Sequence, residues 1–199
     1  MKYLLIVILI THNILICQHD TSIVRLDSID STIVMDVKYA TTNNFTGQKL
    51  YNTNIVYIRK IVGDSLSRAN YYLIKEYNLR IKIFDGYRPL SVQKLMWEIV
   101  PDDRYVANPV KGSKHNRGAA VDITLIDTLG NEVPMGTEYD DFTEKAHFNY
   151  GNLKDEVKYN RDLLRNVMKK FGFEPISSEW WHFDFNGWQR FSILDYEIN

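Results

Sequence analysis

The sequence lacks two features that would simplify its classification. It has a single cysteine, Cys17, among 199 residues, so no intramolecular disulfide can form and the fold must be held by its own core. Long apolar runs are also missing. The one uninterrupted run covers residues 3–10, and such a short segment cannot span a bilayer. We therefore expect neither a disulfide scaffold nor a stable membrane span.

An excess of charge of either sign is absent as well. The formal net charge is −1, which gives no indication of a nucleic-acid or anionic-membrane partner. Hydrophobic residues make up 45% and charged residues 25%, an ordinary balance for a globular protein. No internal repeat, low-complexity tract or linker rich in Gly and Ser interrupts the chain. These observations predict one domain over residues 19–199.

The N-terminal residues have the pattern of a targeting signal. Lys2 precedes the apolar run, which is typical of a secretory signal peptide over residues 1–18. The segment has no A-x-A cleavage pattern, and the bulky Ile16 disfavours lipid attachment at Cys17. We expect export to the periplasm or the medium. Two alternatives are a lipoprotein anchored at Cys17, and a cytoplasmic protein in which this segment is a buried strand.

Hydrophobic periodicity in the remaining chain indicates a mixture of helices and strands. The predicted strands cover residues 33–39, 79–84, 119–127 and 180–185, and the predicted helices cover 55–77, 91–100 and 154–170. Ser91 is expected to cap the second helix, and Leu129-Gly130-Asn131 to form a turn. The order shows no regular βαβ rhythm. It therefore predicts an α+β fold with a mixed or antiparallel sheet and flanking helices.

Two stretches far apart in the chain contain residues suited to one metal site. SKHNRGAAVD at 113–122 offers His115 and Asp122, and SEWWHFDF at 178–185 offers His182. Two imidazoles and one carboxylate are ligands of a hydrolytic zinc site, in which a fourth position is left for water. Alternation in the 119–127 strand separates Asp122 from the apolar face that would pack on the core. The helical H-E-x-x-H pattern is absent.

Two further polar residues have the chemistry to assist such a metal. Glu179 could act as a general base, but it lies three residues before His182. In a regular strand the two would face opposite ways, so Glu179 must precede the strand or lie at a bulge. Arg88 in DGYRP could stabilise a developing oxyanion. It could equally pair with Asp85 or Asp36 and only hold the turn.

The motifs DGYRP, HNRGAAVD and EWWH together resemble those of the zinc D-alanyl-D-alanine dipeptidases of peptidase family M15. DVKYATTNNFTG at 36–47 and VPMGTEYD at 133–140 extend the similarity, which covers about residues 25–190. The resemblance implies the α+β fold of the Hedgehog domain and of the D-Ala-D-Ala peptidases.

The resemblance also implies a role for each matching residue. His115, Asp122 and His182 match the ligands of one zinc ion per chain. Glu179 matches the catalytic base and Arg88 the residue that stabilises the tetrahedral intermediate. Asp140 and Tyr39 match groups that receive the ammonium of the substrate, and Ser113 matches a group near its carboxylate.

These matches predict a dipeptidase that hydrolyses D-alanyl-D-alanine, with a small dipeptide as its partner. Two alternatives are a D,D- or L,D-carboxypeptidase that trims longer peptidoglycan peptides, and a non-catalytic zinc-binding module of the Hedgehog type. The apparent signal peptide departs from the family pattern, since several members look cytosolic. An exported enzyme would more naturally meet cell-wall fragments. The sequence gives no indication of oligomeric state.

Overall fold

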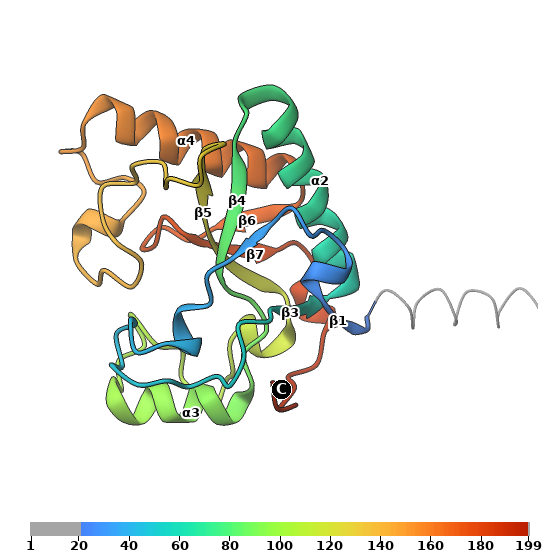
Figure 1. Cartoon of the computed structure of the whole chain (residues 1–199). Coiled ribbons are helices and arrows are strands. Elements are labelled where there is room, and N and C mark those ends of the chain that lie inside the picture. The colour runs from blue at the N-terminus through green and yellow to red at the C-terminus, as the bar shows by residue number, and fades with distance from the viewer. Residues whose placement is uncertain (1–20, 199) are drawn as a thin grey trace, which may run out of the picture.

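A computed structural model describes residues 21–198, and the predicted signal peptide lies outside this range. The central sheet has five strands in the order β2-β4-β5-β7-β6 (Figure 1). The pair β2 and β4 is parallel, and all other neighbours are antiparallel. The predicted α+β fold with a mixed sheet is therefore confirmed. The strands are β2 (Val34–Met35), β4 (Arg80–Asp85), β5 (Ala120–Ile126), β6 (Phe173–Pro175) and β7 (His182–Phe185).

Two helices accompany the sheet and a third lies apart from them. Helices α2 (Lys60–Tyr77) and α4 (Asp155–Lys170) run close together beside the sheet, and α3 (Leu90–Ile99) lies at the opposite end of the molecule (Figure 1). The predicted apolar side of α4 is buried, with Leu164 and Met168 fully inaccessible. Short 3-10 helices are η1 (Leu26–Ser28), η2 (Lys38–Ala40), η3 (His115–Arg117), η4 (Glu144–Ala146) and η5 (Trp188–Arg190).

The N-terminal half departs from the prediction in two places. The helix expected over 55–77 begins only at Lys60, because residues 57–59 form β3 (Tyr57–Arg59), which pairs with β1 (Ile23–Arg25). The buried Val56 and Ile58 lie on either side of the half-buried Tyr57, and this spacing of two fits a strand. Of the strand expected over 33–39, only β2 pairs with a neighbour, since residues 38–40 turn into η2.

The cap predicted at Ser91 is also wrong. Helix α3 begins at Leu90 with Pro89 in the N-cap position, and the Ser91 amide donates to Asp195 Oδ1 at 2.7 Å. A carboxylate from the C-terminal segment thus replaces a local cap, and nothing near Ser91 signals it. The predicted turn does form: the amide of Asp127 donates to the Asn131 carbonyl, and Gly130 has a φ of 88°.

Strand β5 is the centre of the molecule. All its residues are buried, because α2 and α4 cover the sheet on one side and long loops close over the other. It pairs with β4 and β7, so the ends of these three strands lie side by side. Within residues 21–198, no helix combines the length and apolar character needed to cross a membrane.

Candidate active site

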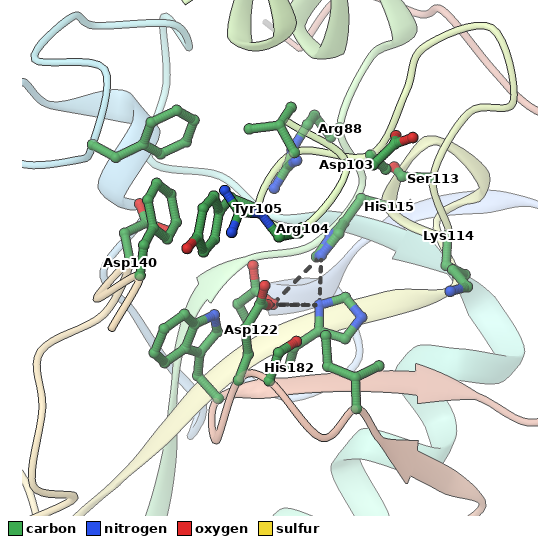
Figure 2. A pocket seen from close by; sticks show the side chains of 18 of the residues that line it. Arg88, Asp103, Arg104, Tyr105, Ser113, Lys114, His115, Asp122, Asp140 and His182 are labelled. Carbon is green, nitrogen blue, oxygen red and sulfur yellow. Dashed lines mark hydrogen bonds and ion pairs between the residues drawn. The ribbon is translucent and has the colours of Figure 1, made fainter. Parts of the chain in front are cut away.

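The three predicted metal ligands meet at the end of β5. Asp122 on β5 lies directly opposite His182, the first residue of β7, in the antiparallel register. His115 belongs to η3, which precedes β5 and ends at Gly118. Gly118 has a φ of 64°, a conformation that is unfavourable for residues with a side chain, and it turns the chain into the strand. Two segments some sixty residues apart thereby form one cluster (Figure 2).

The spacing of the three side chains fits a metal ion. His115 Nε2 lies 3.2 Å from His182 Nδ1 and 3.4 Å from Asp122 Oδ1, and the last two atoms are 3.0 Å apart. Ligands about 2.0–2.1 Å from a tetrahedral zinc are separated by roughly 3.3–3.4 Å. Three lone-pair atoms gathered this closely repel one another unless a cation lies between them. The residues present therefore fit a zinc-sized cation.

The second nitrogen of each imidazole fixes which nitrogen faces the cluster. His115 Nδ1 lies 2.7 Å from the carbonyl oxygen of Gly86, which can only accept, so Nδ1 carries the hydrogen. His182 Nε2 lies 2.9 Å from Asp184 Oδ1, and Asp184 is also paired with Lys114 at 3.2 Å. When the imidazoles are neutral, the nitrogen of each ring that faces Asp122 therefore carries the lone pair, as in metal-ligating histidines.

The electrostatics of the cluster favour a bound positive charge. Burial raises the pKa of Asp122, but the adjacent His115 and His182 outweigh it and hold that pKa well below its usual value. Burial lowers the pKa of His182, yet its hydrogen bonds to Asp122 and Asp184 raise it to about 10. The nitrogen that faces Asp122 therefore binds a cation strongly, and this cation can be a proton or a metal.

Glu179 lies beside the cluster, as its predicted function requires. Trp180 and Trp181 separate it from β7, so it lies ahead of the strand and the strand alternation does not apply to it. Its Oε2 is 3.9 Å from His182 Nδ1. Burial and the neighbouring Asp122 raise the pKa of Glu179 to about 7, although His182 opposes them. A carboxylate with this pKa is well matched to proton transfer at neutral pH.

Arg88 is anchored by its own turn and still reaches the cavity. Its Nε and Nη2 donate to Asp85 Oδ2 at 3.0 and 2.7 Å, and Nη1 donates to Gln93 at 3.0 Å. The pairing with Asp85 considered from the sequence thus occurs, whereas Asp36 pairs with Lys38 instead. These bonds use three of the five guanidinium hydrogens. The guanidinium is therefore held in place while two of its N–H groups remain available to donate hydrogen bonds to an oxyanion.

The three predicted substrate-binding residues line the same cavity of about 450 Å³ as the metal cluster, Arg88 and Glu179. Asp140 and Ser113 lie on opposite sides of the metal cluster (Figure 2). Tyr39 donates to the Asp140 carboxylate at 3.2 Å. Burial and the charge of Asp122 raise the pKa of Asp140 to about 8, against the opposing effect of Arg88. All eight residues predicted from the sequence are thus brought together.

Asp184 and Tyr139 were missed by the sequence reasoning, and Asp85 was considered only as an alternative partner that holds the turn of Arg88. Asp184 orients His182, and its spacing of two within one strand could have revealed it, because alternate residues share a face. Asp85 anchors Arg88, aided by an irregularity in β4 that places it opposite Asp122. Tyr139 donates a hydrogen bond to Asp122 Oδ2 at 3.0 Å. No local pattern in the sequence indicates this contact.

Comparison with known proteins agrees with this geometry. Residues 19–195 match the Peptidase M15 family, described as D-ala-D-ala dipeptidase. A D-alanyl-D-alanine dipeptidase of Escherichia coli K12 is 35% identical over 164 residues, covering 82% of this chain and 84% of the relative. A D-alanyl-D-alanine dipeptidase of Enterococcus faecium is 32% identical, covering 79% and 88%.

Among solved structures, VanYB in complex with D-alanine-D-alanine is 17% identical, with a TM-score of 0.46 over 67% of this chain and 74% of that one. This superposition is loose, so assignment to a family rests on the sequence matches. Those matches span most of both chains, and the family match over residues 19–195 includes every motif that contributes to the cavity. The chain belongs to the Peptidase M15 family of D-Ala-D-Ala dipeptidases.

Proposed function

We propose that this protein is a zinc-dependent dipeptidase that hydrolyses D-alanyl-D-alanine, with one zinc ion held by His115, Asp122 and His182. The observation that carries the proposal is the triangle formed by two imidazole nitrogens and one carboxylate oxygen, with sides of 3.0–3.4 Å, next to the half-buried Glu179. When bound, zinc supplies the Lewis acidity that peptide hydrolysis needs at neutral pH.

The protein residues have separate tasks in this reaction. Glu179 takes a proton from the attacking water and passes it to the leaving amine, since its raised pKa allows both transfers near neutral pH. Arg88 directs its remaining N–H groups at the carbonyl oxygen on which negative charge develops. Because Asp85 and Gln93 already hold the guanidinium, little reorganisation is needed when that charge appears.

The two ends of the cavity account for the choice of a short substrate. A dipeptide has an ammonium and a carboxylate close together. Asp140 and Tyr39 provide acceptors for the ammonium, and Ser113 provides a hydroxyl near the carboxylate. Three rings from separate loops border the cavity. Tyr105 stacks on Phe142 at 4.5 Å between centroids, and Phe45 lies 5.3 Å from Phe142. These rings limit the space available to a longer chain.

One observation favours a second candidate function, a carboxypeptidase acting on longer peptidoglycan peptides. A neighbouring cavity of about 470 Å³ shares Tyr105, Phe142, Ser178 and Glu179 with the first. A longer substrate could extend there if the aromatic rings separate. A non-catalytic zinc-binding module is less consistent with the site, because Glu179 and Arg88 have no need to line the cavity of such a module.

An experiment on the purified protein distinguishes these functions. Hydrolysis of D-Ala-D-Ala, of its N-acetylated form and of a cell-wall pentapeptide is measured with and without a chelator, alongside zinc content. We expect about one zinc per chain and chelator-sensitive hydrolysis of the free dipeptide alone. Equal hydrolysis of the longer peptide would replace the dipeptidase by the carboxypeptidase. If the zinc-loaded protein hydrolyses none of these substrates, the result would favour the non-catalytic zinc-binding module.

We also propose that the protein is exported. The support is Lys2 with the apolar run that follows it, together with a family match that begins at residue 19. Such an enzyme would act on dipeptides or fragments released from the cell wall. Fractionation of cells that express the full gene should place a shortened protein outside the cytoplasm. A full-length product retained in the cytosol would contradict the proposal.

A further inference from the structure

A chain of hydrogen bonds connects the two ends of the functional site. The hydroxyl of Tyr139 lies 3.0 Å from Asp122 Oδ2, the oxygen that does not face the imidazoles. The same hydroxyl lies 3.2 Å from that of Tyr39, which in turn lies 3.2 Å from the Asp140 carboxylate. The proposed ammonium acceptor and the proposed metal ligand are therefore joined through two tyrosines.

The ring of Tyr139 is held so that its hydroxyl stays at Asp122. Its centroid lies 4.9 Å from that of Phe84, 5.4 Å from that of Trp181 and 6.1 Å from that of Tyr39. Aromatic neighbours at these separations make favourable edge contacts that fix the ring plane. None of these contacts requires the hydroxyl, so removal of the oxygen alone should leave the packing intact.

The hydroxyl determines how Asp122 can bind a cation. Asp122 Oδ1 faces the two imidazole nitrogens, whereas Oδ2 accepts the hydrogen bond of Tyr139. With Oδ2 anchored, the carboxylate offers a single oxygen in a fixed direction. We propose, on the basis of the zinc dipeptidase function above, that Tyr139 is a positioning residue that fixes Asp122 for the metal and links it to the ammonium acceptor Asp140.

The link to Asp140 follows from counting hydrogens. Each tyrosine hydroxyl has one hydrogen, so Tyr39 can donate to Asp140 or to Tyr139 but not to both. A substrate ammonium on Asp140 supplies other donors and frees Tyr39 to donate to Tyr139. Tyr139 then accepts one bond while it donates another to Asp122, and bonds in such a series strengthen one another.

Zinc affinity tests the anchoring without relying on turnover. The dissociation constant is measured by competition with a chromophoric chelator for the wild type, for Tyr139→Phe and for Tyr87→Phe. Tyr87 is a matched control, because it is a buried tyrosine whose hydroxyl bonds the backbone of Tyr196 away from the cavity. Partners that orient a metal ligand commonly contribute about 10- to 100-fold in affinity.

We expect Tyr139→Phe to weaken zinc binding by this factor, and Tyr87→Phe to change it by less than about twofold. The absorption spectrum of the cobalt-substituted protein should also change only in Tyr139→Phe, since it reports the geometry of the ligands. Similar metal-free unfolding temperatures for all three proteins will show that the fold is retained. Unaltered zinc affinity and cobalt spectrum in Tyr139→Phe would overturn the positioning role.

The link through Tyr39 has its own test. When D-alanine supplies an ammonium for Asp140, Tyr39→Phe should weaken zinc binding by a smaller factor in the wild type. It should have no effect in Tyr139→Phe, because the bond it supports is then already gone. Additive effects of the two substitutions would overturn the link.

Dipeptide hydrolysis is measured separately from zinc binding. Absence of turnover in the wild type would contradict the proposed function, whereas the zinc measurements would still decide the role of Tyr139.

Discussion

Substitution of Asp140 by Asn tests the proposed selection of a free ammonium. Asp140 has a φ of 59°, in the left-handed region that Asn and Asp tolerate better than other residues with a side chain. Asn keeps that backbone, the size and one acceptor oxygen, and removes only the negative charge. Replacement by Ala would add backbone strain of about 1 kcal/mol and so confuse the result.

The expected loss can be worked out from the surroundings of Asp140. Loss of one partner from a buried ion pair commonly costs about 3–5 kcal/mol. The pKa of Asp140 is raised to about 8, chiefly by burial, so at pH 7 its ionisation for an incoming ammonium costs about 1.4 kcal/mol. The difference is about 1.6–3.6 kcal/mol, which corresponds to a decrease in kcat/KM of roughly 15- to 450-fold.

The assay compares the free dipeptide with its N-acetylated form, which has no ammonium. Asp140→Asn should lose roughly 15- to 450-fold in kcat/KM on the free dipeptide and little on the acetylated one, with zinc content unaltered. The kcat/KM of the wild type on the free dipeptide, divided by that of the variant, should grow as the pH rises from 6 to 7.5. Because the pKa of Asp140 is raised to about 8, a growing fraction of this carboxyl is ionised over that range. Asp141→Asn makes the same change in the adjacent residue, which does not line the catalytic cavity, and should alter kcat/KM by less than about threefold.

Two results would refute this reasoning. One is an equal effect of Asp140→Asn and Asp141→Asn on the free dipeptide, which would show that the charge of Asp140 is not used. The other is an equal loss on free and acetylated dipeptides, which would show that Asp140 supports the site rather than the ammonium.

Three further predictions concern the metal and the base. His115→Ala should abolish zinc binding and turnover together, because two ligands alone hold the ion weakly. Metal analysis of the purified variant checks this prediction, and full activity in a zinc-free protein would contradict it. Glu179→Gln should keep about one zinc per chain and lose roughly 10²- to 10⁴-fold in kcat, which is the usual contribution of a general base. A parallel loss of zinc would show that Glu179 is a metal ligand instead. The kcat of the wild type, which reports the complex in which the substrate ammonium already holds Asp140, should fall as the pH decreases, with its acidic midpoint at or below pH 7. Protonation of Glu179, whose pKa is raised to about 7, removes the base, and a bound dication lowers that pKa further.

The sequence alone determined the family, and it predicted a metal-dependent chemistry and eight residues that line one cavity. Ligand types in HNRGAAVD and EWWH indicated a hydrolytic metal, and the DGYRP turn indicated Arg88. The periodicity of 154–170 was enough to predict α4 with its buried side, because an apolar face repeats every three to four residues wherever a helix packs on a core. These properties depend on residue type and on short-range spacing, and both can be read from the chain.

The tertiary structure decided how these residues act together. Local spacing predicted a helix from residue 55 and a cap at Ser91, whereas pairing with β1 and a carboxylate at Asp195 determined the actual boundaries. The direction of each imidazole likewise depends on Gly86 and Asp184. The anchoring of Asp122 depends on Tyr139, seventeen positions along the chain. Such contacts join segments that approach one another only when the sheet has formed, and their energies depend on burial and on distances of about 3 Å. No pattern of neighbouring residues records those quantities.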